Sequence, residues 1–274
     1  MTGRAAAAGL ALLTLSAGPS AACDLAPGAR PDGLAAYHQL VAGCLAAPPA
    51  PARFDPVAEA EFLARVNLER TSRGLAALAP RSDLLAPARF HSLDQVWNGT
   101  YGHDGSAGRS LGDRIAALDR TLVYRSAREN VAYAGGDYAP GEVAEMLHNG
   151  LMESPGHRAN TLDPDITHAG IGVARVHDQF VVTLVFIEEA GLFGDDVPIR
   201  SGWAELADTH VELGDWNVRR LALQTADGET LEGPGAAAHQ GEARLLVRGE
   251  KPASGGRYQF IYLSGPLVEV ARGE

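Results

Sequence analysis

Residues 180–187 of the chain are Phe-Val-Val-Thr-Leu-Val-Phe-Ile, a run in which nearly every position is apolar. A strand that is apolar on both of its faces must be covered on both sides. Residues 170–176 form a second apolar, β-branched run, and the short turn at His177-Asp178 between the two runs is typical of a β-hairpin. We therefore expect this hairpin to lie in a small sheet that helices cover on both faces.

The chain before this hairpin shows the spacing of helices. One helix is expected to begin at Asp55-Pro56, a capping residue followed by proline at the first helical position, and to end near Gly74. Another is expected from Ser82, with Leu84, Ala88 and His91 on one face, and the chain enters a loop after residues 97–99. Two more are expected over residues 110–118 and 140–153, the second of them ended by Ser154-Pro155-Gly156.

After about residue 194 the pattern changes to short strand-like runs. They lie at residues 219–223, 243–247, 257–263 and 267–270, with turns at Asp227-Gly228 and Gly255-Gly256. This pattern predicts a small all-β module over residues 194–274. It contains no cluster of side chains that indicates chemistry. Trp203 and Trp216 could anchor a partner, although aromatic residues in such positions usually belong to a core.

The first 22 residues have the pattern of a signal peptide. Arg4 gives a charged start, residues 5–15 are apolar but too few to span a bilayer, and Ser20-Ala21-Ala22 supplies the small residues of a cleavage site. No later segment approaches the length of a membrane span. We therefore expect a periplasmic or secreted protein.

Cys23 and Cys44 are the two cysteines of the chain. In an oxidising compartment their spacing predicts one disulfide. It would lie in an N-terminal segment over residues 23–54, with a short helix over residues 34–45 and a stiff Ala/Pro-rich linker after it. The alternative is a lipid anchor on Cys23, directly after the expected cleavage point. Ser20 in place of an aliphatic residue, and the unpaired Cys44 that would result, favour the disulfide.

The composition indicates a folded protein and disfavours one class of binding partner, nucleic acid. The 274 residues include 46% hydrophobic residues, enough for a sizeable core. There are 23 Lys and Arg against 34 Asp and Glu, which gives a formal net charge of −11, and no basic run occurs. Nucleic-acid binding needs clustered positive charge, so this balance disfavours a nucleic-acid partner.

Four side chains in the central part of the chain are candidates for chemistry: His103, Glu129, Glu153 and His157. Imidazoles and carboxylates suit a divalent ion, above all zinc. The two histidines are 54 residues apart, however, and the chain has no compact metal motif such as His-Glu-x-x-His. Spacing alone therefore does not assign a site.

Six motifs occur in order between about residues 57 and 188. They are Val66-Asn-Leu-Glu-Arg70 with Gly74-Leu-Ala-Ala-Leu78, Ala88-Arg-Phe-His-Ser-Leu-Asp94, Tyr101-Gly-His103, Glu129-Asn-Val-Ala132, Ser154-Pro-Gly-His-Arg-Ala-Asn160 and Ile171-Gly-Val-Ala174. Together they resemble the CAP family of cysteine-rich secretory, antigen 5 and pathogenesis-related-1 proteins, in its bacterial branch. The resemblance covers roughly half the chain and implies an α-β-α sandwich, here over residues 55–190, in an α+β chain.

The resemblance also implies a concave cleft lined by two histidines and two acids. His103 matches the first histidine, Glu129 the first acid and His157 the second histidine. Leu151 stands where the family has a Trp before the second acid, so Glu153, with Glu145 as the other candidate, is the expected match.

Other polar residues of the motifs are expected to be structural. Asn67 and Asn130 are expected to hydrogen-bond buried backbone. His91 is expected to pack beneath the cleft.

The resemblance implies an exported protein that binds zinc through His103 and His157, with Glu129 as a hydrogen-bond acceptor or a ligand through water. It also implies a small or lipidic ligand, or a partner in the cell envelope or outside the cell, and it assigns no enzyme activity. The alternative is a hydrolase (a protease or esterase), either metal-dependent or built on Ser154, His157 and Glu129. In a third hypothesis, the C-terminal module is the interaction surface.

Overall fold

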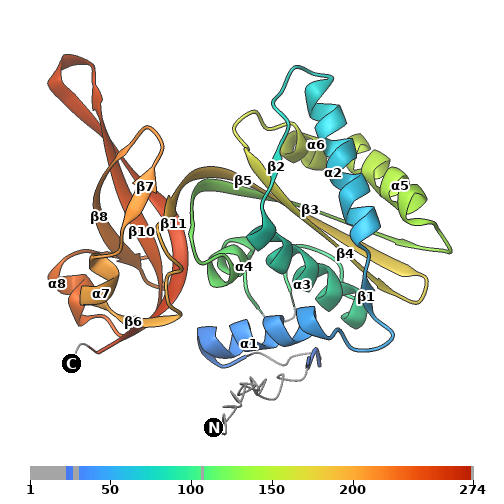
Figure 1. The fold of residues 1–274 in the computed structure, drawn as a ribbon, viewed down its shortest axis with the longest axis horizontal. Helices are drawn as coiled ribbons and strands as arrows, with labels where there is room; N and C mark the ends of the chain where they lie inside the picture. The colour runs from blue at the N-terminus through green and yellow to red at the C-terminus, as the bar shows by residue number, and fades with distance from the viewer. Residues whose placement is uncertain (1–22, 27–30, 106–107, 273–274) are drawn as a thin grey trace, which may run out of the picture.

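The structure is a computed structural model that describes residues 23–26, 31–105 and 108–272. The expected signal peptide over residues 1–22 lies outside the described residues. The fold is mixed, as predicted, with most helices gathered around one part of a sheet and the C-terminal strands forming the other part (Figure 1).

The helices of the central region begin where the sequence predicts. The Ala58 N–H donates to the Asp55 carboxylate over 3.0 Å at the start of α2 (Pro56–Thr71). Helix α3 (Ser82–Asn98) ends at Gly99 in the left-handed conformation. A capping box begins α4 (Leu111–Leu118), and α5 (Pro140–Glu153) has the predicted bounds.

One helix of the central region was not predicted. Ser154-Pro155-Gly156 ends α5, but Pro155 is also the first residue of α6 (Pro155–Thr161). Proline is well tolerated at a helix start, because the N–H that it lacks would have no partner in the helix. His157 therefore lies in the first turn of a helix rather than in a loop.

The predicted hairpin is the centre of the sheet. Strands β4 (His168–Val176) and β5 (Gln179–Phe193) pair antiparallel, and every residue from Phe180 to Ile187 is buried. On its other side β5 pairs with β3 (Leu122–Gly135), a strand that was not expected from the sequence and that carries Glu129. The short strands β1 (Arg53–Phe54) and β2 (Ala79–Pro80) pair with β4.

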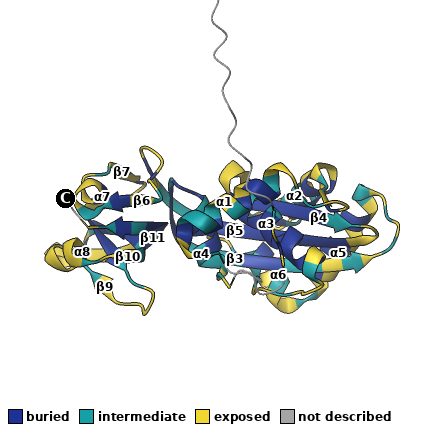
Figure 2. Cartoon of the chain, turned by 90° about the horizontal axis from the view of Figure 1, so that it is seen from below, coloured by how far each residue is buried: buried dark blue, intermediate teal, exposed yellow. Residues whose placement is uncertain are grey.

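Helices cover both faces of this sheet. Phe180, Val182, Leu184 and Phe186 pack in one cluster with side chains of α2 and α5. The alternate residues of β5 face α3: Val185 and Ile187 cluster with Leu84 and Ala88, and Thr183 accepts a hydrogen bond from Ser92. The strands are accordingly buried between helices whose outer faces are exposed (Figure 2). This is the expected α-β-α sandwich.

The N-terminal segment completes one helical layer. The disulfide between Cys23 and Cys44 is present, and α1 (Gly33–Ala46) carries Leu34, Tyr37 and Val41 into a cluster with residues of α3 and α4. The Ala/Pro-rich stretch after α1 leads into β1, which adds to the sheet edge. These residues therefore pack against the central region.

The C-terminal region is rich in strands, as expected. Its strands are β6 (Arg200–Gly202), β7 (Val211–Leu213), β8 (Asn217–Gln224), β9 (Thr230–Leu231), β10 (Gly241–Ala253) and β11 (Arg257–Ala271). It also holds two short helices, α7 (Trp203–Ala207) and α8 (Pro234–Ala238), and the two runs expected over 257–270 form one strand. Trp203 and Trp216 are partly buried against its hydrophobic cluster.

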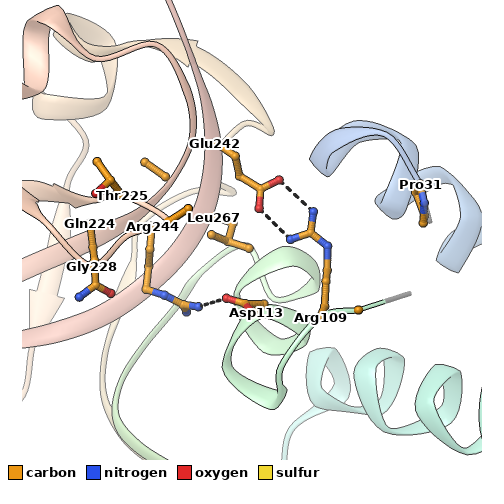
Figure 3. A pocket seen from close by; sticks show the side chains of 12 residues that line it. Pro31, Arg109, Asp113, Gln224, Thr225, Gly228, Glu242, Arg244 and Leu267 are labelled. Carbon is orange, nitrogen blue, oxygen red and sulfur yellow. Dashed lines mark hydrogen bonds and ion pairs between the residues drawn. The ribbon is translucent and has the colours of Figure 1, made fainter. Parts of the chain in front are cut away.

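Two kinds of contact join this region to the central one. Strand β11 meets β3 at Ser264 and Tyr124, so the sheet continues in the order β3-β11-β10-β8-β9. At the N-terminal end of α4, Arg109 pairs with Glu242 and Asp113 pairs with Arg244 of β10, beside a pocket of about 480 Å³ (Figure 3). No described helix has both the length and the apolar character needed to cross a membrane.

Candidate functional site

The site is centred on Glu129, a buried carboxylate in the middle of β3. His103, in the loop after α3, has a side chain that is 62% exposed and places Nδ1 2.9 Å from Glu129 Oε1. When Nδ1–H donates to the carboxylate, the other ring nitrogen, Nε2, keeps its lone pair. A carboxylate partner of this kind fixes the orientation of a metal-binding histidine and makes it more basic.

Arg114 of α4 pairs with the second carboxylate oxygen of Glu129. Its buried guanidinium donates to Glu129 Oε2, to the His103 carbonyl oxygen at 3.0 Å and to the Arg109 carbonyl oxygen at 2.9 Å. Each oxygen of Glu129 therefore already accepts a hydrogen bond. The carboxylate is placed to orient His103 and is not a free metal ligand.

His157 is held next to this group by the start of α6. Asn130, which follows Glu129 on β3, donates to the His157 carbonyl oxygen at 2.9 Å, and Asn160 donates to the Glu129 carbonyl oxygen at 3.1 Å. Partial burial, and then the charge that His103 can carry, lowers the pKa of His157. The lowered pKa favours the neutral form of the His157 ring, which is the form that binds a metal.

The second expected acid has no hydrogen bond to this group. Glu153 is the last residue of α5 and is exposed, and among the described residues it forms no hydrogen bond or ion pair with His103, Glu129 or His157. Glu145 pairs with Arg65 of α2 at 3.0 Å. The structure thus joins the side chains of His103 and Glu129 and holds the backbone of His157 beside them through Asn130.

His91 lies beneath the cleft, as expected. It is 1% exposed, and its Nε2 lies 3.0 Å from the Gly102 carbonyl oxygen and 3.9 Å from Glu129 Oε1. Burial, with a smaller contribution from Arg114, lowers the pKa of His91 to about 3. This neutral histidine supports the loop that carries His103.

The two asparagines have the expected structural roles. Asn67 exchanges hydrogen bonds with the backbone of Leu78, and Asn130 donates to backbone as described above. The sequence analysis did not identify Arg114 or Asn160. Arginine is rarely buried, so nothing in the pattern around Arg114 indicated its position.

A pocket of about 370 Å³ opens beside His103. It is lined mainly by polar and charged side chains: His103, Asp104, Ser110, Leu111, Ala127, Arg128, Glu129 and Asn160. Near the same loop, Tyr101 stacks on the exposed Tyr133 with ring centroids 4.1 Å apart. The pocket has room for a small ligand with polar groups.

The described residues do not form a closed metal site. Among the described residues, no three His, Cys, Asp or Glu side chains form a ligand cluster. Structural zinc sites use four protein ligands. His103 and His157 could supply two imidazole nitrogens, with solvent completing the coordination.

A serine triad is not assembled. Among the described residues, the Ser154 hydroxyl makes no hydrogen bond to His157, and it does not cap α6. Glu129 contacts the ring of His103 instead of His157. A serine nucleophile needs a base within hydrogen-bond reach.

Comparison with known proteins matches the central region. Residues 63–187 match the model of the cysteine-rich secretory protein family, CAP. The uncharacterized membrane protein YlbC of Bacillus subtilis is 32% identical over 123 residues, which are 45% of this chain and 33% of that protein. The uncharacterized protein YkwD of the same organism is 32% identical over 114 residues, 42% of this chain and 41% of that protein.

The chain therefore spans less than half the length of these two relatives. Among solved structures, an extracellular protein containing an SCP domain from Bacillus anthracis has 28% identity and a TM-score of 0.41, and the match covers 49% of this chain and 41% of that one. Since six family motifs, the sandwich fold and the family model coincide over the same part of the chain, residues 63–187 form a CAP domain.

Proposed function

We propose that the protein acts outside the cytoplasm as a binding protein whose CAP domain holds one divalent metal ion, above all zinc, between His103 and His157. The observation that carries this proposal is the hydrogen-bonded series from Arg114 through Glu129 to His103. These hydrogen bonds fix the ring of His103 through Nδ1 and leave Nε2 to bind a metal, in a loop that is exposed to solvent.

The metal would be exchangeable. With two imidazole ligands from the protein, the remaining coordination positions of the metal ion would be filled by water or by a bound molecule. A bound ion would supply a positive Lewis acid that attracts an anionic or carbonyl oxygen. The adjoining pocket is lined in part by Asp104, Arg128 and Asn160, which offer hydrogen-bonding groups to a small ligand.

An extracytoplasmic location is supported by two features. A disulfide such as Cys23–Cys44 persists in oxidising compartments and is rare in the cytosol. The first 22 residues also have the pattern of a signal peptide. The geometry at Ser154 gives no support to a serine hydrolase, and we propose a binding role for the site.

Calorimetric titration of the untagged protein with zinc chloride tests the proposal. The expected result is one zinc per chain for the parent protein, and no binding at this site for His103→Ala/His157→Ala. Removal of two histidines elsewhere, in His168→Ala/His210→Ala, is the matched control and should leave binding unchanged. Equal zinc uptake by parent and His103→Ala/His157→Ala would falsify the proposal.

The same titration tests the role of Glu129. Glu129→Gln keeps the shape but removes the charge that holds His103, so zinc affinity should fall roughly 10- to 100-fold. Since the imidazoles must be neutral to bind, the parent's affinity should also fall in acidic solution. Unchanged affinity in Glu129→Gln would show that the carboxylate does not orient a ligand.

A further inference from the structure

The C-terminal region carries a row of exposed aromatic side chains far along the sheet from the metal site. Tyr258, Phe260 and Tyr262 are 55%, 54% and 45% exposed. They occupy alternate positions of β11, so they share one face of the sheet and follow one another at about 6.6 Å. Ile261 and Leu263, between and after them, belong to the hydrophobic cluster on the other face.

Charged side chains of β10 lie beside this row. Glu250 is opposite Phe260 and Arg248 is opposite Tyr262 in the strand pairing. The guanidinium carbon of Arg248 lies 4.6 Å from the centroid of the Phe260 ring, a cation–π contact. The Nε of Arg248 is buried and has no hydrogen-bond partner among the described residues.

Two further arginines, from β8, complete the surface. Arg219 pairs with Glu250, and Arg220 pairs with Glu232 at 2.8 Å; both arginine side chains are more than half exposed. Tyr262 donates its hydroxyl hydrogen to Glu232. A hollow of about 330 Å³ lies here, lined by Arg219, Arg220, Arg248, Glu250 and Phe260.

We call these eight residues the aromatic face: Arg219, Arg220, Glu232, Arg248, Glu250, Tyr258, Phe260 and Tyr262. It has three arginines against two glutamates, a local positive excess in a chain whose formal net charge is −11. The β10–β11 hairpin extends away from the helical part of the molecule, so a long molecule could reach this face (Figure 1).

We propose that the aromatic face binds an acidic glycan, a polysaccharide whose sugar rings carry carboxylate groups. Sugar rings present C–H groups on their faces, and these stack against the electron-rich faces of aromatic rings. Guanidinium groups bind carboxylates through two parallel hydrogen bonds, and the exposed guanidiniums of Arg219 and Arg220 and the local positive excess favour such a ligand. The glutamates can accept hydrogen bonds from sugar hydroxyls.

Two other occupants fit the surface less well. Insertion into a lipid bilayer needs large apolar side chains at the leading edge, and the hairpin tip is Ser254-Gly255-Gly256. Nucleic acid requires clustered positive charge for the phosphates. Glu232 and Glu250 lie among the arginines, and the whole chain is acidic.

Affinity electrophoresis of the full chain in native gels tests the proposal, with EDTA present to remove metal. Gels contain polygalacturonate as the acidic glycan or dextran as the neutral one, and a thymidine oligonucleotide is tested in solution. Polygalacturonate should retard the protein, whereas dextran and the oligonucleotide should bind at least about tenfold more weakly.

The triple variant Tyr258→Ala/Phe260→Ala/Tyr262→Ala removes the three exposed rings. The variant Arg248→Ala removes the guanidinium that contacts the Phe260 ring. Each change should weaken polygalacturonate binding at least about tenfold. The matched controls are Tyr101→Ala/Tyr133→Ala and Arg73→Ala, which change exposed side chains elsewhere and should bind as the parent does. His103→Ala/His157→Ala should also bind as the parent does, which separates this proposal from the metal site.

Circular dichroism melting of each variant shows whether it is folded, and exposed positions are expected to tolerate alanine. The proposal is overturned if polygalacturonate does not retard the parent, if the folded triple variant is retarded equally, or if the oligonucleotide binds as tightly.

Discussion

Arg114 and Glu129 form a buried ion pair on which the candidate site rests. Both side chains are 3% exposed or less, so the charge of each is compensated by the other and by hydrogen bonds. Removing one partner of such a pair leaves an uncompensated buried charge. Arg114 therefore matters to His103 both through Glu129 and through the His103 carbonyl oxygen.

We predict that Arg114→Met lowers the free energy of unfolding by about 3–5 kcal/mol at neutral pH. The control is Arg73→Met, which removes the exposed Arg73–Glu69 pair and should cost about 1 kcal/mol or less. Urea unfolding measures both. Similar small losses in the two variants would contradict a structural role for the buried pair.

His91 makes stability depend on pH. Its pKa is about 3 in the folded chain, because of burial and the nearby Arg114, and about 6.5 in an unfolded chain. Between these values the unfolded state binds the extra proton, so the contribution of His91 to stability is complete above pH 6.5 and is lost as the pH falls. The limiting slope is about 1.4 kcal/mol per pH unit.

We predict that His91→Asn has a shallower loss of stability than the parent between pH 6.5 and 4.5. Urea unfolding in EDTA at several pH values measures the two slopes. The absolute stability of the variant is not the test, because asparagine fills less space; parallel pH profiles would show that His91 is not the titrating group.

At this scale the sequence predicted part of the arrangement. Family motifs identified His103 and Glu129, whose side chains are in contact, and His157, whose backbone is bonded to Asn130 next to Glu129. The motifs could not reveal that Arg114 donates to Glu129, because that contact depends on how α4 packs against β3. Glu153 was chosen from its position after Leu151, and it lies exposed at the end of α5.

Among the elements, close packing of α3 on β4 depends on glycine. A Cβ added at Gly172 would lie 2.2 Å from the Arg89 backbone nitrogen and 2.4 Å from the Ala88 carbonyl carbon. These are backbone atoms of a helix, so they cannot move aside as a flexible side chain could. The strand and the helix would have to separate.

We predict that Gly172→Ala lowers the free energy of unfolding by about 2 kcal/mol or more through overpacking. Gly150→Ala is the matched control, since an added Cβ meets nothing within 4 Å at this exposed position in α5. It should raise stability by about 0.5–1 kcal/mol, because alanine favours helix. Thermal or urea unfolding measures the pair, and equal effects of the two changes would refute the packing argument.

Most elements could be predicted because their signals are local. Asp55-Pro56 begins α2, Ser110 caps α4 and the apolar run at residues 180–187 is a buried strand. Strand β3 escaped prediction because charged and polar residues, among them Arg128, Glu129 and Asn130, interrupt its apolar pattern. Its pairing with β5 comes from the tertiary fold and not from local propensity.

In the whole molecule, the C-terminal region is connected to the candidate site through α4. Glu242 and Arg244 of β10 hold Arg109 and Asp113 (Figure 3). The Arg109 carbonyl oxygen accepts a hydrogen bond from Arg114, whose guanidinium also donates to the His103 carbonyl oxygen. Contacts made by the C-terminal strands therefore reach the loop of His103 through α4.

We predict that Glu242→Ala/Arg244→Ala weakens zinc binding severalfold although neither residue lies at the metal site, because the loop of His103 is held less firmly. Arg220→Ala, which removes an exposed ion pair elsewhere in the same region, is the control and should bind zinc as the parent does. Zinc calorimetry checks both. Identical affinities would show that the two regions are independent.

The arrangement of the two imidazoles is most directly tested by a crystal structure of the protein grown with zinc, with diffraction data collected at the zinc absorption edge. We expect one anomalous peak about 2.0–2.1 Å from a ring nitrogen of His103 and from one of His157, with His103 Nδ1 still bonded to Glu129. No peak between the two rings, or a peak at other side chains only, would contradict the account.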